Sequence, residues 1–383
     1  MGMFRIKNSD ESWMNVALAL ATRGLGAVWP NPSVGCIFVK NQRILARGVT
    51  AEGGRPHAEQ IALSLAQTND HADAKGADVY VTLEPCSHIG KTESCARLLI
   101  EAQVAKVYVA ILDPDHRVNG RGVAMLQNAG IPVQTGLCAA QAKAVNAGFI
   151  KRITENFPFL TVKMATTLDG KIAAEGGESQ WISSSRSRLQ TQWLRAQHDA
   201  VLVGIGTVLA DDPRLTVRIK GLERKPVRVV VDSSLSIPRD SFIVQTAKQQ
   251  EVWCLHTKRA PQNQRDFLHS AGVRLFEIKE DHNEKVSLPM AMHALAAEGI
   301  TRVLCEGGGR LFASFLEHDN LIDQLVWVTA GRIAGAGGVP SCFHLGIKNI
   351  SRLPNFTLLS QRAYGDDVYT IWGKDDNVYG ISE

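Results

Sequence analysis

Short apolar runs alternate with amphipathic segments along almost the whole chain of 383 residues. The runs at 77–85 and 106–114 are typical of buried strands, whereas 95–103 and 122–130 have helical spacing. Strands that alternate with helices predict a layered α/β unit with a largely parallel central sheet.

The first helix is expected over residues 10–25, with Asp10 as its cap. A later helix should begin near His57, because apolar residues follow it at helical spacing. Its apolar face is expected to include Ile61 and Leu65.

The length predicts about two or three domains. The polar stretch GFIKRITENFPF at 148–159 carries Pro158, which is typical of a domain junction. Strand and helix patterns resume after it. We therefore expect two α/β domains of unequal size, at 1–150 and 151–383.

The net charge of +4 is nearly balanced over this length, which argues against a protein that binds nucleic acid through the phosphate backbone. A small anionic substrate is compatible with it. Seven scattered cysteines, an odd number, indicate a reducing compartment rather than a disulfide framework. Neither a signal peptide nor an apolar run of ~18 residues is found, so we expect a cytoplasmic protein without membrane spans.

Metal-binding residue types stand at two expected helix starts. His57 begins one helix and Cys95 another, and Cys86 follows the strand that ends at Pro85. Helix N-termini favour thiolate over thiol. One histidine and two cysteines leave the fourth tetrahedral position open, as in catalytic zinc sites. Such a zinc activates water, and Glu59, close to His57 but not a ligand, can carry the proton.

The pattern H-x-E followed by P-C-x-x-C is typical of zinc nucleobase deaminases. HAE and PC match it here, but eight residues separate Cys86 from Cys95 instead of two. His88 lies within this insert and is a weaker candidate for a ligand than for a substrate contact. The remaining cysteines are interpreted as core or loop residues: Cys36, Cys138, Cys254, Cys305 and Cys342.

The segment EPCSHIGKTESC, with NPSVGC upstream, resembles the deaminase half of the bifunctional riboflavin-biosynthesis deaminase-reductase family, RibD/RibG. The resemblance implies a cytidine-deaminase-like α/β/α domain that binds a phosphoribosylated pyrimidine. Asp115 stands where the family has an amide, and a carboxylate cannot donate a hydrogen bond. The substrate contacts that the resemblance implies are Asn31, His88, Lys91 and Asp113.

The second domain contains two glycine-rich stretches. The stretch at 201–218 lacks the third glycine of G-x-G-x-x-G and is a poor dinucleotide signature. The stretch at 303–317 runs from a strand through three glycines into a helix, which can offer N–H groups to a phosphate. A tight strand-helix turn explains it equally well.

VKMATTLDGKIA, GESQWIS and EGGGRL resemble, in this order, the NADPH-dependent reductase half of the same family. The implied fold is like dihydrofolate reductase and not a Rossmann domain. The implied cofactor contacts are Ala165, Trp181, Thr207, Asp211, Gly308, Gly309, Arg310, Leu311, Phe312, Ala313 and Ser314. The implied substrate contacts are Ser179, Arg195, Leu215, Arg218 and Glu306.

Side-chain chemistry agrees in part with this assignment. Arg195 and Arg218 can bind a ribose phosphate through two points, although a surface ion pair is the alternative. Trp181 can stack on a cofactor ring, although a core position is the commoner one. Lys163 can approach the sugar from its strand, and Glu306 can orient it.

We therefore expect hydrolytic, zinc-dependent deamination of a diamino-pyrimidinone ribosylamine 5′-phosphate, followed by NADPH reduction of its ribosyl chain to ribityl. The family suggests a dimer or tetramer. Two alternatives remain open at this point. One is a tRNA or free-nucleoside deaminase joined to an unrelated domain, and the other is a non-enzymatic scaffold stabilised by zinc.

Overall fold

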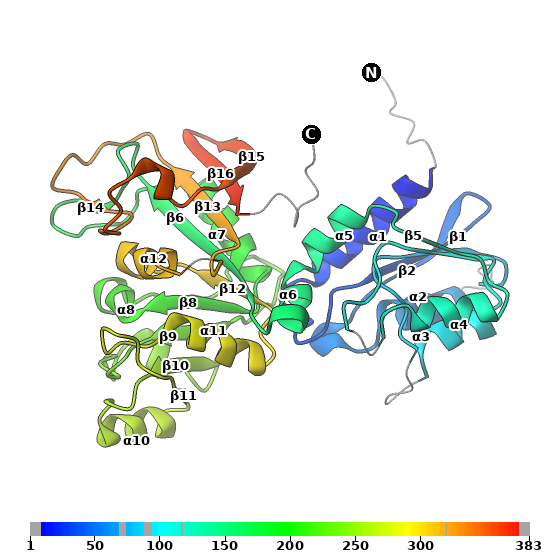
Figure 1. The fold of residues 1–383 in the computed structure, drawn as a ribbon, viewed down its shortest axis with the longest axis horizontal. Helices are drawn as coiled ribbons and strands as arrows, with labels where there is room; N and C mark the ends of the chain where they lie inside the picture. Colours follow the sequence, from blue (N-terminus) through cyan, green and yellow to red (C-terminus); the bar gives the residue numbers. More distant parts are fainter. Residues whose placement is uncertain (1–8, 69–73, 88–92, 116–117, 319, 375–383) are drawn as a thin grey trace. The chain divides into compact units, whose positions relative to one another are not determined.

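The computed structural model describes residues 9–68, 74–87, 93–115, 118–318 and 320–374, and these form two compact units divided between Glu155 and Asn156 (Figure 1). Helix α6 (Ala147–Glu155) passes through residue 150 and ends at this division. None of the described helices combines the length and apolarity that a membrane crossing needs.

The first unit contains a five-stranded sheet with the order β2-β1-β3-β4-β5. Four of its strands, β2, β3, β4 and β5, run in the same direction, as expected for a largely parallel sheet, and β1 is antiparallel to both of its neighbours, β2 and β3. Asn41 and Gln42, both with positive φ, form the two-residue turn that reverses the chain. The strands are β1 (Gly35–Lys40), β2 (Arg43–Val49), β3 (Asp78–Val81), β4 (Lys106–Val109) and β5 (Val133–Thr135).

Helices cover both faces of this sheet, as the layered α/β/α expectation requires (Figure 1). On one face lie α1 (Asp10–Gly24) and α5 (Ala139–Val145); on the other lie α2 (Ala58–Thr68), α3 (Cys95–Glu101) and α4 (Arg121–Asn128). The cap of α1 is Ser9, which accepts the Ser12 N–H, and not Asp10. Asp10 instead accepts a hydrogen bond of 2.6 Å from the Tyr80 hydroxyl.

Helix α2 packs on the sheet through small residues. A Cβ on Gly48 of β2 would lie 2.0 Å from the Ala58 carbonyl oxygen, so helix and strand approach closely only because position 48 is glycine. Ala62 and Ala66 continue this buried face. Leu65 points elsewhere and is 47% exposed, so its expected core position is wrong.

The second unit contains a nine-stranded sheet with the order β11-β10-β9-β8-β12-β6-β13-β16-β15. It is parallel from β11 to β13, and β16 and β15 add an antiparallel hairpin. The strands are β6 (Phe159–Thr166), β8 (Ala200–Gly204), β9 (Val227–Val231), β10 (Val252–His256), β11 (Arg274–Glu277), β12 (Arg302–Cys305), β13 (Gln324–Thr329), β15 (Thr357–Tyr364) and β16 (Asp367–Gly373).

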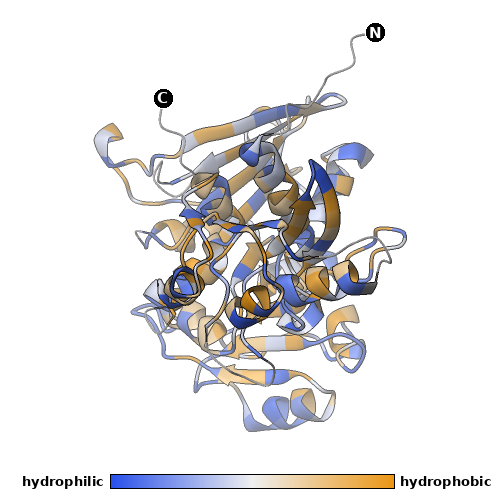
Figure 2. Cartoon of the chain, turned by 90° about the vertical axis from the view of Figure 1, so that its right-hand side faces the viewer, coloured by the Kyte–Doolittle hydropathy of each residue, from blue (hydrophilic) through white to orange (hydrophobic). Residues whose placement is uncertain are grey.

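Further elements of this unit are a small sheet of β7 (Lys171–Ala173) and β14 (Val339–Pro340), and helices α7 (Ser185–Ala196), α8 (Ile205–Asp211), α9 (Phe242–Gln245), α10 (Gln262–Ser270), α11 (Leu288–Ala297) and α12 (Gly309–Leu316). Strands such as β8 and β10 are almost wholly buried, and strands are largely orange in Figure 2. Helices show mixed colours there, as expected for segments with one face in solvent.

This topology gathers the loops of the candidate reductase site at one edge of the sheet. Strands β8, β12 and β6 are parallel neighbours, so their carboxyl ends lie side by side. Helix α8 begins directly after β8, and α12 begins shortly after β12. The N-termini of both helices therefore face the same edge, where α/β proteins commonly bind ligands.

Candidate functional site

The N-terminus of α2 fixes His57. Its backbone N–H donates to Oε1 of Gln60 at 3.0 Å, which is one half of a capping box. The amide of Gln60 also donates to the carbonyl of Glu93 at 3.5 Å, close to the start of α3. Gln60 therefore ties the helix that carries His57 to the segment that leads to Cys95.

The two thiols converge on the same point. Cys95 is the first residue of α3, whose cap is Ser94, and its N–H donates to Sγ of Cys86 at 3.3 Å. Nδ1 of His57 lies 3.6 Å from Sγ of Cys86 and 3.3 Å from Sγ of Cys95. The three residues that the sequence predicts as ligands are thus brought together.

This donor set fits a zinc ion. The three ligand atoms all lie within 4.8 Å of one another, and within the described ranges they form the one such cluster of three or more histidine, cysteine or acidic side chains. The Cys95 thiol donates to Cys86, and this contact lowers the pKa of Cys86 to about 4, with help from His57 and against the effect of burial. A thiolate is the form that binds a metal. One histidine and two cysteines leave a tetrahedral ion one open position.

Glu59 lies in the first turn of α2 and is only 4% exposed. Burial, and next the charge of Cys86, raise the pKa of Glu59 to about 7. Its carboxyl group is thereby able to hold or release a proton near neutral pH. Cys36 of β1 lies within electrostatic range of Glu59 and is fully buried, as expected for a core residue.

Glu84 organises the loop beside this cluster, and the sequence reasoning missed it. The side chain is 4% exposed and accepts four backbone N–H groups. The donors to Oε2 are Asp113 at 3.1 Å and Gly120 at 2.9 Å, and the donors to Oε1 are Gly122 at 2.8 Å and Val123 at 3.1 Å. An acidic residue before Pro-Cys, followed by a glycine-containing loop, was the available signal.

Of the four residues expected to contact the pyrimidine substrate, the structure describes two, Asn31 and Asp113. Asn31 donates to the carbonyl of Gly53 at 3.4 Å and lies against the loop that leads to His57. Asp113 accepts the N–H of Asp115 at 2.9 Å, and Asp115 is largely buried. His88 and Lys91 lie outside the described residues.

In the second unit, Glu306 and Arg195 form a two-point ion pair. The Nε–Oε1 distance is 2.6 Å, the Nη2–Oε2 distance is 2.9 Å, and Nη1 donates to the Thr216 carbonyl at 3.0 Å. The side chains are 10% and 12% exposed, so the surface ion pair considered for these residues is wrong. Because Glu306 occupies the Nε edge of Arg195, this edge does not offer two points to a phosphate.

Lys163 of β6 shares this charged cluster. Burial lowers the pKa of Lys163, and the nearby carboxylate of Glu306 opposes that effect. Burial alone would raise the pKa of Glu306, but Arg195 and then Lys163 outweigh it, and the pKa lies below its ordinary value. Glu306 is therefore an ionised acceptor between two cations, suited to a sugar hydroxyl.

The cofactor positions at the two helix N-termini come together. A Cβ on Gly308 would lie 4.0 Å from Oγ1 of Thr207, so the caps of α8 and α12 are neighbours. Leu311 reaches the same place, 3.6 Å from a Cβ on Gly204. Ala165 is half-buried near the end of β6, which adjoins β12.

Other expected cofactor positions in α12 face the core or the neighbouring loop. Phe312 is 5% exposed and its ring lies 5.9 Å from Trp327, so only its backbone is available. Ala313 is equally buried, and Ser314 is half-buried. Gly309 approaches the 340–341 backbone, where a Cβ would lie 2.6 Å from a carbonyl oxygen.

Trp181 is 57% exposed, so the alternative of a core tryptophan is wrong. The guanidinium of Arg188 lies over its ring, 4.4 Å from the centroid. Ser179 donates to Asp211 at 3.2 Å, which joins an expected substrate position to an expected cofactor position. An exposed indole ring of this kind can stack on a flat ring.

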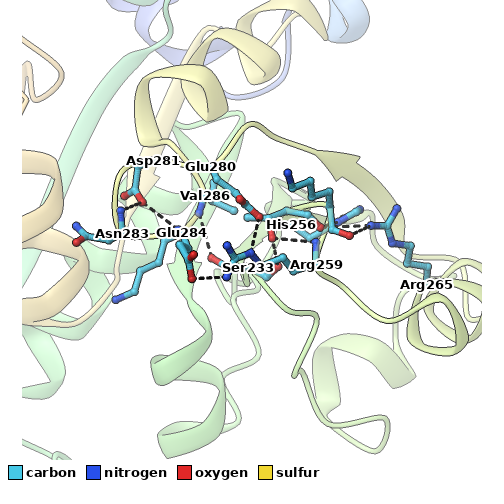
Figure 3. A network of polar contacts seen from close by, with 12 residues as sticks. Ser233, His256, Arg259, Arg265, Glu280, Asp281, Asn283, Glu284 and Val286 are labelled. Atoms are coloured by element: carbon cyan, nitrogen blue, oxygen red, sulfur yellow. Dashed lines mark hydrogen bonds and ion pairs between the residues drawn. The ribbon is translucent and has the colours of Figure 1, made fainter.

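A polar network at the carboxyl ends of β9 to β11 also escaped the sequence reasoning (Figure 3). Arg259 forms ion pairs with Glu280, at 3.0 Å, and with Glu284. Ser233 accepts the N–H of Val286 at 3.1 Å. These contacts fasten the loop before α11 to the sheet edge.

Comparisons with known proteins find relatives of both units. Residues 7–111 match the family described as "Cytidine and deoxycytidylate deaminase zinc-binding region", and residues 158–370 match "RibD C-terminal domain". Riboflavin biosynthesis protein RibD of Bacillus amyloliquefaciens is 36% identical over 97% of this chain and 99% of its own length. The Escherichia coli protein of that name is 38% identical over 94% and 98%.

Solved structures are similar to the chain over both of its units. RibD of Acinetobacter baumannii matches with a TM-score of 0.83 and 35% identity, over 95% of this chain and 98% of that one. A Thermotoga maritima structure, described as a diaminohydroxyphosphoribosylaminopyrimidine deaminase/5-amino-6-(5-phosphoribosylamino)uracil reductase, matches with a TM-score of 0.83, 33% identity and the same coverage.

Fold and sites together define a bifunctional enzyme, in which a zinc-dependent deaminase is joined to an NADPH-dependent reductase. The cytidine-deaminase-like and reductase folds expected from the sequence are confirmed. The chain belongs to the RibD family of riboflavin biosynthesis proteins.

Proposed function

We propose that the chain acts twice on one phosphoribosylated pyrimidine. The first unit hydrolyses the 2-amino group of 2,5-diamino-6-(ribosylamino)-4(3H)-pyrimidinone 5′-phosphate and releases ammonia. The second reduces the ribosyl chain with NADPH and gives 5-amino-6-(ribitylamino)uracil 5′-phosphate. The deaminase/reductase activity by which the Thermotoga maritima structure is described supports this substrate.

In this proposal the zinc ion is held by His57, Cys86 and Cys95. When bound, the ion would supply Lewis-acid activation of a water molecule. Glu59 takes the proton of the attacking water and returns it to the departing amine. The observation that carries this assignment is the burial of Glu59, at 4% exposure, beside the three converging ligand atoms. A zinc-stabilised scaffold gives no reason to bury a carboxylate there.

Substrate binding in the first unit is assigned to Asn31, Asp113, His88 and Lys91. Asn31 lies against the loop before His57, and this position supports a contact between its amide and the substrate. A lysine in the insert between the cysteines suits a ribose phosphate as a point charge. Glu84 supports Asp113 by accepting its N–H.

The reductase step uses the hydride of NADPH, and the protein supplies placement and charge. The adjoining N-termini of α8 and α12 are suited to the cofactor phosphates. We assign cofactor contacts to Ala165, Trp181, Thr207, Asp211, Gly308, Gly309, Arg310, Leu311, Phe312, Ala313 and Ser314. We assign substrate contacts to Lys163, Ser179, Arg195, Leu215, Arg218 and Glu306.

The cellular setting is part of the proposal. A small phosphorylated substrate and a pyridine-nucleotide cofactor are cytoplasmic metabolites, and we place the enzyme there without nucleic-acid or membrane partners. We propose a homo-oligomer, a dimer or a tetramer. Light scattering of the purified protein measures this directly.

The experiment that tests the proposed function uses one purified sample. The wild-type enzyme should release ammonia from the phosphoribosyl substrate, and NADPH oxidation should follow. A chelator should stop ammonia release, and added zinc should restore it. NADPH oxidation of the separately supplied deaminated intermediate should continue in chelator. Ammonia release that persists after complete metal removal would contradict the zinc mechanism.

A further inference from the structure

The segment between α8 and β9 carries two of the proposed substrate contacts without regular secondary structure of its own at 213–218. Leu215 lies in it with φ of 52°, in the left-handed region that a leucine seldom adopts, and is 2% exposed. Such a conformation persists only where the surroundings hold it. The contacts that hold this segment therefore determine where Arg218 stands.

Two side chains of α7 hold the segment. Gln192 and Arg195 are three residues apart, so they project from the same side of the helix. Oε1 of Gln192 accepts the backbone N–H of Arg218 at 2.9 Å. Nη1 of Arg195 donates to the Thr216 carbonyl at 3.0 Å. Gln192 is 8% exposed, so water does not readily replace its hydrogen bond.

The segment ends in a concentration of positive charge. Burial, followed by the charges of Arg195 and Arg214, lowers the pKa of Arg218, and Glu306 is the acidic group that opposes them. Arg214 is itself placed by the ring of Phe242, whose centroid lies 5.1 Å from the guanidinium carbon. A phosphate monoester offsets such an excess of positive charge.

We infer that Gln192 is a positioning residue of the reductase site. By accepting the Arg218 N–H, it fixes the backbone from which Arg218 presents its guanidinium to the phosphate of the substrate. The inference rests on the proposed function, in which Arg218 contacts the phosphoribosyl substrate. Arg195 does not substitute for Gln192, because Arg195 donates to the carbonyl of Thr216 and not to the backbone of Arg218.

The test compares Gln192→Met, which removes the acceptor at similar volume, with Gln192→Glu, which keeps an acceptor oxygen. Thr191→Val is the matched control, since Thr191 is the buried neighbour that bonds back to the Ser187 carbonyl of its own helix. For each full-length variant, KM and kcat are measured for the deaminated phosphoribosyl substrate, for its dephosphorylated analogue and for NADPH. Ammonia release reports correct folding of the first unit, and an unchanged KM for NADPH reports correct folding of the second unit.

In Gln192→Met we expect KM for the phosphorylated substrate to rise about ten-fold, the effect of one lost buried hydrogen bond. KM for the dephosphorylated analogue and for NADPH should change less than about two-fold, and Gln192→Glu and Thr191→Val should resemble the wild type. In an Arg218→Ala background, Gln192→Met should add nothing to KM, because coupled residues are not additive.

Three results would overturn the inference. One is an equal rise in KM for both forms of the substrate, and another is a Gln192→Glu variant as impaired as Gln192→Met. The third is a Gln192→Met variant in which the ratio of KM for the dephosphorylated analogue to KM for the phosphorylated substrate is the same as in the wild type. A wild type that reduces both forms equally well would overturn the proposed role of Arg218 itself.

Discussion

Arg195 and Glu306 meet through two hydrogen bonds, of 2.6 and 2.9 Å, at the carboxyl end of β12. Burial of both side chains makes each the main electrostatic partner of the other. Removing one partner from such a pair leaves a buried charge without compensation. The pair therefore supports the fold and also sets the charge next to Lys163.

We expect Arg195→Ala and Glu306→Ala each to lower the free energy of unfolding by about 3 kcal/mol or more. The double variant Arg195→Ala/Glu306→Ala should lose less than the sum of the single variants, because the two side chains interact directly. Denaturant unfolding of the full chain measures these values, and ammonia release follows the first unit. Strict additivity would contradict a coupled pair.

Glu84→Gln should weaken the deaminase without removing its metal. An amide has one acceptor oxygen, so at least two of the four backbone N–H groups lose their partner, at a cost of about 2 kcal/mol or more. The loop that carries Asp113 should then lose its fixed position. We therefore expect KM for the deaminase substrate to rise in this variant, while its zinc content stays that of the wild type. The control is Glu101→Gln, because Glu101 pairs with Arg97 on the surface. Equal behaviour of the two variants would contradict the role of Glu84.

His198 should make the second unit sensitive to acid. It is 3% exposed, Nδ1 donates to the Leu194 carbonyl at 2.7 Å, and Nε2 accepts from Thr161 at 3.0 Å. Burial, and then the charge of Arg302, lowers its pKa to about 3. In the unfolded chain a histidine has a pKa of about 6.5.

Between these two values the unfolded chain binds a proton that the folded chain does not. The free energy of unfolding should therefore fall as the pH falls from about 6.5 toward 3. His198→Gln should show a smaller fall, whereas His282→Gln, at an exposed loop position, should keep the wild-type slope. Identical slopes in all three proteins would show that His198 does not contribute.

Arg310 is exposed at the start of α12, and its guanidinium lies over the ring of Phe343, 4.9 Å from the centroid. If Arg310 reads the 2′-phosphate, Arg310→Ala should raise KM for NADPH about ten-fold and leave KM for NADH nearly unchanged. Arg310→Lys should be intermediate, because it keeps the charge and loses the planar fork. Equal weakening of both cofactors would refute this role.

The sequence predicted the zinc cluster because two of its residues stand at helix starts and the third follows a strand, and local patterns reveal both kinds of position. His57 and Cys95 both mark such starts, and the convergence of the ligands followed from these positions. Alternation of strands and helices, a local signal, predicted only two layered α/β domains, whereas the particular fold of each domain and their order were implied by the family resemblance.

Contacts between distant residues were not predictable from local patterns. Glu84 binds backbone groups up to 39 residues away, and Glu306 meets Arg195 across 111 residues. Leu65 looked like core because periodicity shows an apolar face without showing what packs on it. In the structure the sheet packs at Gly48 against the face of α2 that carries alanines, and Leu65 lies outside this contact.

The central claim, that Glu59 carries the proton in a zinc-dependent deamination and takes no part in the reduction, is tested most directly by Glu59→Gln. Zinc content, ammonia release and NADPH oxidation of supplied deaminated substrate are measured on one sample of this variant. We predict wild-type zinc, wild-type NADPH oxidation, and ammonia release reduced at least about 10²-fold. Ammonia release at the wild-type rate, with zinc bound, would contradict the account.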